Sequence, residues 1–110
     1  MGSSSAVIVG AIASAYEMAG IKASRETILN KAIIYETHPD NIAPAVYGGF
    51  TSSIVENGKV KTLRKEMSEK LKVVMVIPDR PMSTAHSRTL LPKTYLMKNV
   101  VYNLSHASLL

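Results

Sequence analysis

The sequence lacks the residues on which several classes of protein depend. Its 110 residues include no cysteine, no tryptophan and a single phenylalanine. The absence of cysteine excludes disulfide bonds and thiolate metal sites. No apolar run reaches the roughly 18 residues that a membrane-spanning helix needs, and the N-terminus has no basic segment typical of a signal peptide. These absences fit a protein of the reducing cytoplasm, and we expect no membrane partner.

Positive charge is in excess, but the basic residues do not form the continuous stripe expected of a nucleic-acid-binding surface. The formal net charge is +5 and the sequence pI is about 9.6. Nucleic-acid-binding surfaces cluster lysine and arginine on one face and often interleave aromatic side chains. Here the basic residues are scattered and aromatic residues make up only 5% of the chain. We expect no nucleic-acid partner, and the basic balance also suits a protein that handles ATP.

Two helices are predicted before residue 37. Residues 2–5 form a turn and N-cap signal, and the small and apolar residues 6–19 then predict a helix that Gly20 ends. Because this helix is apolar on most sides, we expect it to be buried. Ser24 is a plausible N-cap for a second helix over residues 25–36. Its apolar face consists of Ile28, Leu29, Ala32 and Ile33.

A proline and a pair of glycines bound the next predicted helix. The residue before a proline disfavours the helical conformation, so the segment 37–41 interrupts the second helix. Asp40 or Asn41 then caps a short helix over residues 42–47, which Gly48 and its neighbouring glycine end.

The pattern changes to strands after residue 49. Residues 50–56 and 59–63 flank Asn57-Gly58, the dipeptide most typical of a two-residue β-hairpin turn. The chain therefore combines helices with a hairpin, and we predict an α+β fold.

The last third of the sequence predicts a linker, one strand and two helices. Residues 66–70 are polar and suggest a domain boundary, whereas residues 72–77 are apolar and β-branched and predict a buried strand. Ser83 can cap a helix over residues 84–91. A final helix begins near Leu96, and its inward face consists of Val100, Val101, Leu104 and Ala107.

A serine cluster precedes the first predicted helix. Gly2, Ser3, Ser4, Ser5 and Ala6 lead directly into it. A helix N-terminus offers unpaired N–H groups and a partial positive charge, and glycine lets the backbone approach a phosphate closely. The Gly-Lys-Ser/Thr ending of a Walker A loop is absent. Taken alone, the motif allows both phosphate binding and simple helix capping.

Further stretches of sequence resemble one enzyme family. Residues 38–45 read His-Pro-Asp-Asn-Ile-Ala-Pro-Ala and are followed by Gly-Gly at 48–49, which resembles the homoserine kinase signature His-Pro-Asp-Asn-Val-Ala-Pro-Ala with its Gly-Gly. The first loop resembles the Gly-Leu-Gly-Ser-Ser-Ser-Ala motif of the GHMP kinase superfamily, with Met1 in the leucine position. The downstream family block is matched by residues 77–79, 83–85, Arg88, 91–93 and 103–105.

The resemblance implies an enzyme of threonine biosynthesis. It would transfer a phosphoryl group from ATP, with Mg²⁺, to the side-chain hydroxyl of L-homoserine, giving O-phospho-L-homoserine and ADP. The family fold implies that residues 1–66 are the back half of an ATP-binding domain like domain 2 of ribosomal protein S5. Residues 67–110 would start a ferredoxin-like C-terminal domain. The 110 residues would be a central piece, inactive alone, and a homodimer is left open.

The resemblance also assigns roles at the start of the chain. Gly2, Ser3, Ser4, Ser5 and Ala6 would hold the ATP phosphates, and Ser4 is the hydroxyl that we expect to contact Mg²⁺ and to serve catalysis. Glu36 is the second metal ligand implied. Relatives often carry another acidic residue two positions earlier, where this chain has Ile34. A solvated carboxylate at a helix end is the alternative for Glu36.

The substrate residues implied by the family lie on two segments. His38, Asp40 and Asn41 would contact homoserine, with Asn41 in a catalytic role. Some GHMP kinases have an aspartate base at that place, whereas an amide cannot accept a proton at neutral pH. Asn41 would therefore position the hydroxyl. Thr84 and Arg88 lie four residues apart on one helix face, and Arg88 would bind the homoserine carboxylate.

Plainer alternatives remain for each residue and for the chain. Asp40 and Asn41 could be helix caps, His38 a structural turn residue and Arg88 a surface arginine. The protein could be another GHMP kinase, such as one for mevalonate, although those usually have aspartate at position 41 and lack the block at 83–85. It could also be a non-catalytic binding module on the same fold.

Overall fold

The computed structural model describes residues 2–77, 79 and 84–109 of the chain, which divides into two compact units, residues 1–73 and 74–110. Each unit is considered by itself. Among the described residues, no helix is both long and apolar enough to cross a membrane. In chain order the elements are α1 (Ser3–Met18), α2 (Arg25–Ala32), α3 (Pro39–Tyr47), β1 (Phe50–Glu56), β2 (Lys59–Lys65), α4 (Thr84–Thr89) and α5 (Met97–Ala107).

Helix α1 begins earlier than the sequence predicts and ends at Met18, one residue before the predicted end. Its N-cap is Gly2, and Ser3 is already helical, so the serine cluster forms the first turn instead of preceding it. At the other end Gly20 has φ +68°. The amide of Gly20 donates to Glu17 O, and that of Ile21 donates to Tyr16 O, both at 3.0 Å. This Schellman pair satisfies the last carbonyls of the helix and confirms Gly20 as its stop.

The expectation that the first helix is buried is wrong for the described chain. Ser5 is the one residue of α1 that is buried, and the side chains of Val7 and Met18 are 70% and 89% exposed. Among the described elements, α1 contacts α2 and α3 only. Two short helices cover one side of a longer one, and the apolar residues on its other sides stay in contact with solvent.

Helix α2 is shorter than predicted, although its cap and its apolar face are as expected. Ser24 Oγ accepts a hydrogen bond from the Thr27 amide at 3.0 Å, which confirms the N-cap. The helix ends at Ala32 instead of residue 36. The amides of Ile34 and Tyr35 bond to carbonyls three residues back, and this tighter pattern ends the α-helical turn. Of the predicted apolar face, Leu29, Ala32 and Ile33 are buried and Ile28 is half-buried.

Helix α3 starts at Pro39, so the prediction that Asp40 or Asn41 caps it is wrong. His38 is the N-cap residue and provides no side-chain cap hydrogen bond. A proline suits the first helical position because its φ is fixed near the helical value and its missing N–H would have no partner there. Asp40 and Asn41 consequently lie in the first turn. Gly48, with φ +67°, ends the helix as predicted.

The hairpin prediction is confirmed. Strands β1 and β2 pair antiparallel with Glu56 opposite Lys59, and β2 extends to Lys65, two residues further than predicted. Asn57 and Gly58 have φ values of +52° and +72°, as a type I′ turn requires. The core beneath the hairpin joins α2, α3 and β2, and its buried members are Leu29, Ala32, Ile33, Ile42, Ala43 and Val60.

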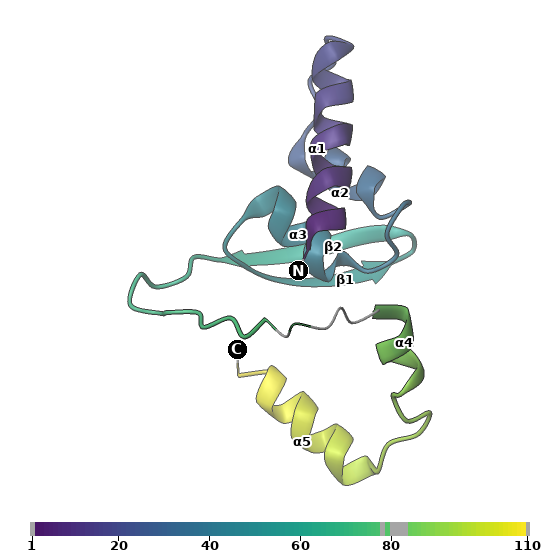
Figure 1. Ribbon diagram of the computed structural model, residues 1–110, viewed down its shortest axis with the longest axis vertical. Helices are drawn as coiled ribbons and strands as arrows, with labels where there is room; N and C mark the ends of the chain where they lie inside the picture. The colour runs from purple at the N-terminus through teal and green to yellow at the C-terminus, as the bar shows by residue number, and fades with distance from the viewer. Residues whose placement is uncertain (1, 78, 80–83, 110) are drawn as a thin grey trace. The chain divides into compact units, whose positions relative to one another are not determined.

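In Figure 1 the first turns of α1, drawn in the darkest purple, lie at the end of that helix nearest to α3 and the hairpin. The contacts agree, because α1 packs on α2 and α3, and α3 packs on β1. This arrangement brings the amino ends of α1 and α3 into one region of the first unit.

The strand predicted over residues 72–77 is wrong. That segment has no regular structure, and Val74 and Val76 are 86% and 88% exposed. A strand needs a neighbouring strand to pair its N–H and C=O groups, and the described residues contain only the sheet of β1 and β2. The described residues still confirm the α+β class, because they combine helices with the two-stranded sheet of β1 and β2.

The second unit contains α4 and α5, which differ from the predictions in length and burial. Helix α4 ends at Thr89 instead of residue 91, and its predicted cap, Ser83, lies outside the described residues. Helix α5 begins at Met97, as expected, but has no buried residue. Val101 and Leu104, predicted to face inward, are 55% and 66% exposed. The described part of this unit provides too little surface to cover them.

Candidate functional site

The first turn of α1 presents backbone amides without helical partners. The Ala6 amide makes the first helical hydrogen bond, to Gly2 O at 3.0 Å. The amides of Ser3, Ser4 and Ser5 come before that bond, so they have no partner within the helix. Gly2 provides no side-chain cap, and the first turn contains no acidic residue. This helix end therefore retains the partial positive charge that favours an anion.

The three serines of this turn have different surroundings. Ser3 and Ser4 are exposed, whereas Ser5 is completely buried. The Ser5 hydroxyl donates a hydrogen bond to Glu36 Oε2 at 2.6 Å. A short bond to a carboxylate is among the stronger hydrogen bonds in proteins. It joins the start of α1 to the loop that follows α2, and Glu36 itself is half-buried.

Asn41 lies against Gly2. A Cβ atom added to Gly2 would meet Asn41 Oδ1 at 3.4 Å and Asn41 Cγ at 3.8 Å. Gly2 also has φ +70°, a conformation that glycine adopts easily and other residues adopt at a cost. The first unit thus brings the amino end of α1 next to Glu36 and Asn41, which lie more than 30 residues later in the sequence.

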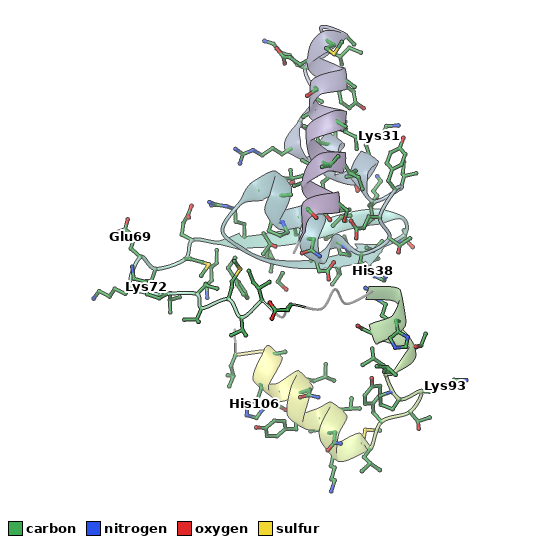
Figure 2. The ribbon with its side chains drawn as sticks, viewed as in Figure 1. Lys31, His38, Glu69, Lys72, Lys93 and His106 are labelled. Carbon is green, nitrogen blue, oxygen red and sulfur yellow. The ribbon has the colours of Figure 1, made fainter. Side chains whose placement is uncertain are left out.

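The rest of the predicted turn lies at the start of α3 and is exposed to solvent. His38, labelled in Figure 2, and Asp40 are exposed. Asp40 Oδ1 accepts a hydrogen bond from the Asn41 amide at 3.1 Å. A carboxylate in the first turn complements the positive end of α3. Asp40 therefore satisfies one amide of α3 from inside the helix.

Two of the remaining predicted residues belong to the second unit. Thr84 and Arg88 both lie on α4, and Arg88 is exposed. For Thr84 the structure describes the backbone but not the side chain. Ala6, the last member of the predicted phosphate loop, is exposed on α1.

The donors at the start of α1 fit one kind of cation better than others. In the described part of the chain, no group of three or more His, Cys, Asp or Glu side chains could hold a metal ion. This composition does not fit Zn²⁺, which takes three or four such ligands. Mg²⁺ usually binds through one or two carboxylates, several waters and the phosphates of a substrate. One carboxylate, Glu36, beside serine hydroxyls and a helix end with unpaired amides fits Mg²⁺ bound with a phosphate ligand.

Sequence reasoning missed the pairing of Ser5 with Glu36. The motif gave the three serines a common role and favoured Ser4 for the contact to metal, whereas the hydrogen bond to the carboxylate comes from Ser5. The two partners are 31 residues apart, and no local periodicity connects them. The one available signal was that both residues belong to family motifs.

The comparisons with known proteins agree with the resemblance. Residues 1–49 match the family model described as the GHMP kinases N terminal domain. The homoserine kinase of Campylobacter concisus (strain 13826) is 66% identical over 110 residues, which is 100% of this chain and 37% of that protein. Those of a Nitratiruptor species and of Helicobacter pylori (strain J99) are 64% and 57% identical, each over 100% of this chain and 38% of the relative. No solved structure matches. The chain thus spans less than two fifths of the length of these relatives.

Proposed function

We propose, from the premise that this chain is homologous to homoserine kinases over its whole length, that it forms part of an ATP-dependent enzyme that phosphorylates the side-chain hydroxyl of L-homoserine. The observation that carries the proposal is the meeting of two distant segments of the chain at one place. The serine turn lies beside the segment that carries Glu36 and Asn41, and the Ser5–Glu36 hydrogen bond and the Gly2–Asn41 approach bring the two together.

The serine turn is proposed to bind the phosphates of ATP. The amides of Ser3, Ser4 and Ser5 would donate to phosphate oxygens, and the partial charge of α1 would favour the anion. The absence of a side chain at Gly2 lets the backbone approach closely, and Ala6 adds no bulk beside it.

Glu36 is proposed to hold Mg²⁺ together with the phosphates, with the exposed hydroxyl of Ser4 as a second ligand. When bound, Mg²⁺ neutralises charge on the phosphates during phosphoryl transfer. The protein contributes one carboxylate, a hydroxyl and a helix end whose first turn contains no acidic residue of its own.

Asn41 is proposed to position the homoserine hydroxyl, with His38 and Asp40 near the amino acid. An asparagine amide can donate and accept hydrogen bonds but cannot act as a general base at neutral pH. The γ-phosphate itself would take the hydroxyl proton, and phosphoryl transfer tolerates the lack of a protein base because its transition state is loose and depends mainly on alignment and charge neutralisation. Asn41 lies against Gly2, which would put the hydroxyl next to the phosphates.

Arg88 and Thr84 are proposed as substrate-binding residues from the second unit. A guanidinium can bind the homoserine carboxylate through two parallel hydrogen bonds. Thr84 is four residues earlier on α4 and therefore on the same helix face.

The remaining family properties belong to this proposal as well. The ATP-binding domain would comprise residues 1–66 with a ribosomal protein S5 domain 2-like fold, followed from residue 67 by a ferredoxin-like domain. The whole enzyme would act in the cytoplasm in threonine biosynthesis, and a homodimer is compatible with it.

A chimaeric enzyme tests the proposal. This 110-residue chain would replace the matching segment of the Campylobacter concisus relative, which is 66% identical over that length. ADP release would be measured with homoserine, mevalonate and shikimate in turn, with the unaltered relative as the control. We expect homoserine-dependent turnover within about tenfold of the control, because the substituted segment carries every proposed contact.

Other outcomes favour the alternatives. Turnover with mevalonate instead of homoserine would indicate a different small-molecule kinase of the superfamily. A folded chimaera that binds ADP but phosphorylates none of the three alcohols would indicate a non-catalytic module. A chimaera that fails to fold while the relative folds would also count against the proposal, since homologous segments with the same role should be interchangeable.

A further inference from the structure

We propose that Ser5 is a positioning residue that holds the Glu36 carboxylate for the cation, a role distinct from that of its neighbours Ser3 and Ser4. The inference rests on the proposed function and assigns a separate task to one serine of the phosphate turn. The observation behind it is the hydrogen bond from Ser5 Oγ to Glu36 Oε2 at 2.6 Å, made by a completely buried serine.

Because Ser5 is buried, its hydroxyl must bond to another group of the protein and not to water. In the described residues, no buried side-chain nitrogen or oxygen lacks a hydrogen-bond partner. The Ser5 hydroxyl has no access to solvent, and Glu36 is the partner that satisfies it. Ser3 and Ser4 are exposed and can exchange partners with water. Ser5 is therefore the serine of the turn whose hydroxyl is already engaged by protein.

Glu36 needs such a partner because its backbone is not in a helix. It follows the turn at residues 33–35, beyond the end of α2. A glutamate side chain has three rotatable bonds, and ordering it costs conformational entropy. The bond from Ser5 restricts those rotations and fixes the carboxylate beside the first turn of α1. The constraint comes from a helix, which is a more rigid support than a loop.

The hydrogen bond also gives the two carboxylate oxygens of Glu36 different roles. Oε2 accepts from Ser5, and Oε1 is the oxygen that the bond does not use. Ligand carboxylates are commonly hydrogen-bonded by outer residues that orient them, and loss of such a partner typically costs about 10- to 100-fold in metal affinity or activity. Ser5 would thus act on the cation through Glu36 and make no contact with it.

The test measures cation binding directly in the chimaeric enzyme. Mn²⁺ replaces Mg²⁺ as a paramagnetic probe, and its dissociation constant in the presence of ADP is measured by electron paramagnetic resonance. We expect Ser5→Ala to weaken Mn²⁺ binding by about 10- to 100-fold. ADP binding without a divalent cation should change by less than about threefold, since the amides of the turn remain. In the assay, the Mg²⁺ concentration at half-maximal rate should rise by a similar factor to the Mn²⁺ dissociation constant.

Matched variants separate orientation from packing. Ser5→Cys keeps the shape of the side chain, with a somewhat larger atom, but offers a weak donor, so it should behave like Ser5→Ala if the hydrogen bond matters. Ser14→Ala makes the same change at an exposed position of α1 and should leave Mn²⁺ binding unaltered. In a Glu36→Gln background, Ser5→Ala should add little, because the two residues act through one carboxylate.

Each result supports or overturns the inference. Unchanged Mn²⁺ affinity in Ser5→Ala and Ser5→Cys, with a clear loss in Glu36→Gln, would overturn the role of Ser5 and leave the proposed function standing. Additive losses in the double variant would also overturn it. A parent chimaera that binds no Mn²⁺ with ADP would overturn both proposals. If Ser5→Ala fails to fold, Ser5→Cys decides the question by the same measurement.

Discussion

At the scale of single residues, the backbone conformation of Gly2 favours glycine. Its φ of +70° is costly for a residue with a Cβ atom, whereas the space is sufficient, since a Cβ there would be in ordinary contact with Asn41 Oδ1 at 3.4 Å. We expect Gly2→Ala to lower the free energy of unfolding by about 1–2 kcal/mol. Gly10→Ala is the matched control because Gly10 lies inside α1 with nothing within 4 Å of the added Cβ. It should stabilise the chain by up to about 1 kcal/mol.

Chemical denaturation of both glycine variants would measure these changes. The two variants are expected to change the free energy of unfolding in opposite directions, whereas a general effect of an added methyl group would change it in the same direction in both. A Gly2→Ala chain as stable as the parent would show that the left-handed conformation at the start of α1 is not required.

Replacement of Arg88 tests the proposed binding of the homoserine carboxylate. If its guanidinium binds the homoserine carboxylate, Arg88→Ala in the chimaeric enzyme should raise the KM for homoserine by on the order of 10- to 100-fold, the loss expected for a charge-assisted hydrogen bond. The KM for ATP should change little. Lys93→Ala is a suitable control, because Lys93 is exposed in the same unit and has no proposed role. Steady-state kinetics with each substrate varied in turn would detect the split, and equal effects on both KM values would argue against this role.

At the scale of elements, the cap of α2 supports the position of Glu36. Ser24 Oγ accepts from the Thr27 amide at 3.0 Å, and α2 carries the core residues that precede Glu36. Ser24→Ala should therefore reduce the free energy of unfolding by about 1 kcal/mol. Denaturant titration would measure the loss, with Ser14→Ala in the exposed part of α1 as the control. A loss shared by both variants would mean that alanine in place of serine, and not the cap, explains the effect.

The elements also show which features of this chain could be read from sequence. The Ser24 cap, the Gly20 stop and the Asn57-Gly58 turn are encoded by a few neighbouring residues, and each prediction was correct. The strand over residues 72–77 and the burial of α1 and α5 were wrong. A strand and a buried face exist only where another part of the molecule pairs with them or covers them, and an apolar run does not say whether that partner is present.

In the candidate site, too, features set by neighbouring residues could be predicted and features set by tertiary packing could not. The unpaired amides at the start of α1 could be predicted because they depend on adjacent residues and on the helix they begin. The Ser5–Glu36 bond and the approach of Asn41 to Gly2 could not. They depend on how α1 packs against α2 and α3, across 31 residues in the case of Ser5 and Glu36.

At the scale of the whole molecule, the proposed activity needs more surface than these residues offer. The chain spans 37% of the Campylobacter concisus relative, and its candidate site consists of one helix end, one loop carboxylate and one asparagine. Bound substrates are usually enclosed on most sides in an enzyme pocket, whereas Ser3, Ser4 and Asn41 are exposed here. A phosphoryl-transfer site that stays open to water lacks the exclusion of solvent that strengthens its electrostatic contacts.

We therefore expect the 110 residues alone to release no ADP in response to homoserine. A coupled assay with ATP, Mg²⁺ and homoserine would compare the isolated chain with the chimaeric enzyme at equal concentration. The same preparation should be checked for folding by circular dichroism, so that inactivity is not confused with loss of structure. Robust homoserine-dependent turnover by the isolated chain would contradict the prediction, because it would mean that the serine turn, Glu36 and Asn41 align both substrates without further enclosure.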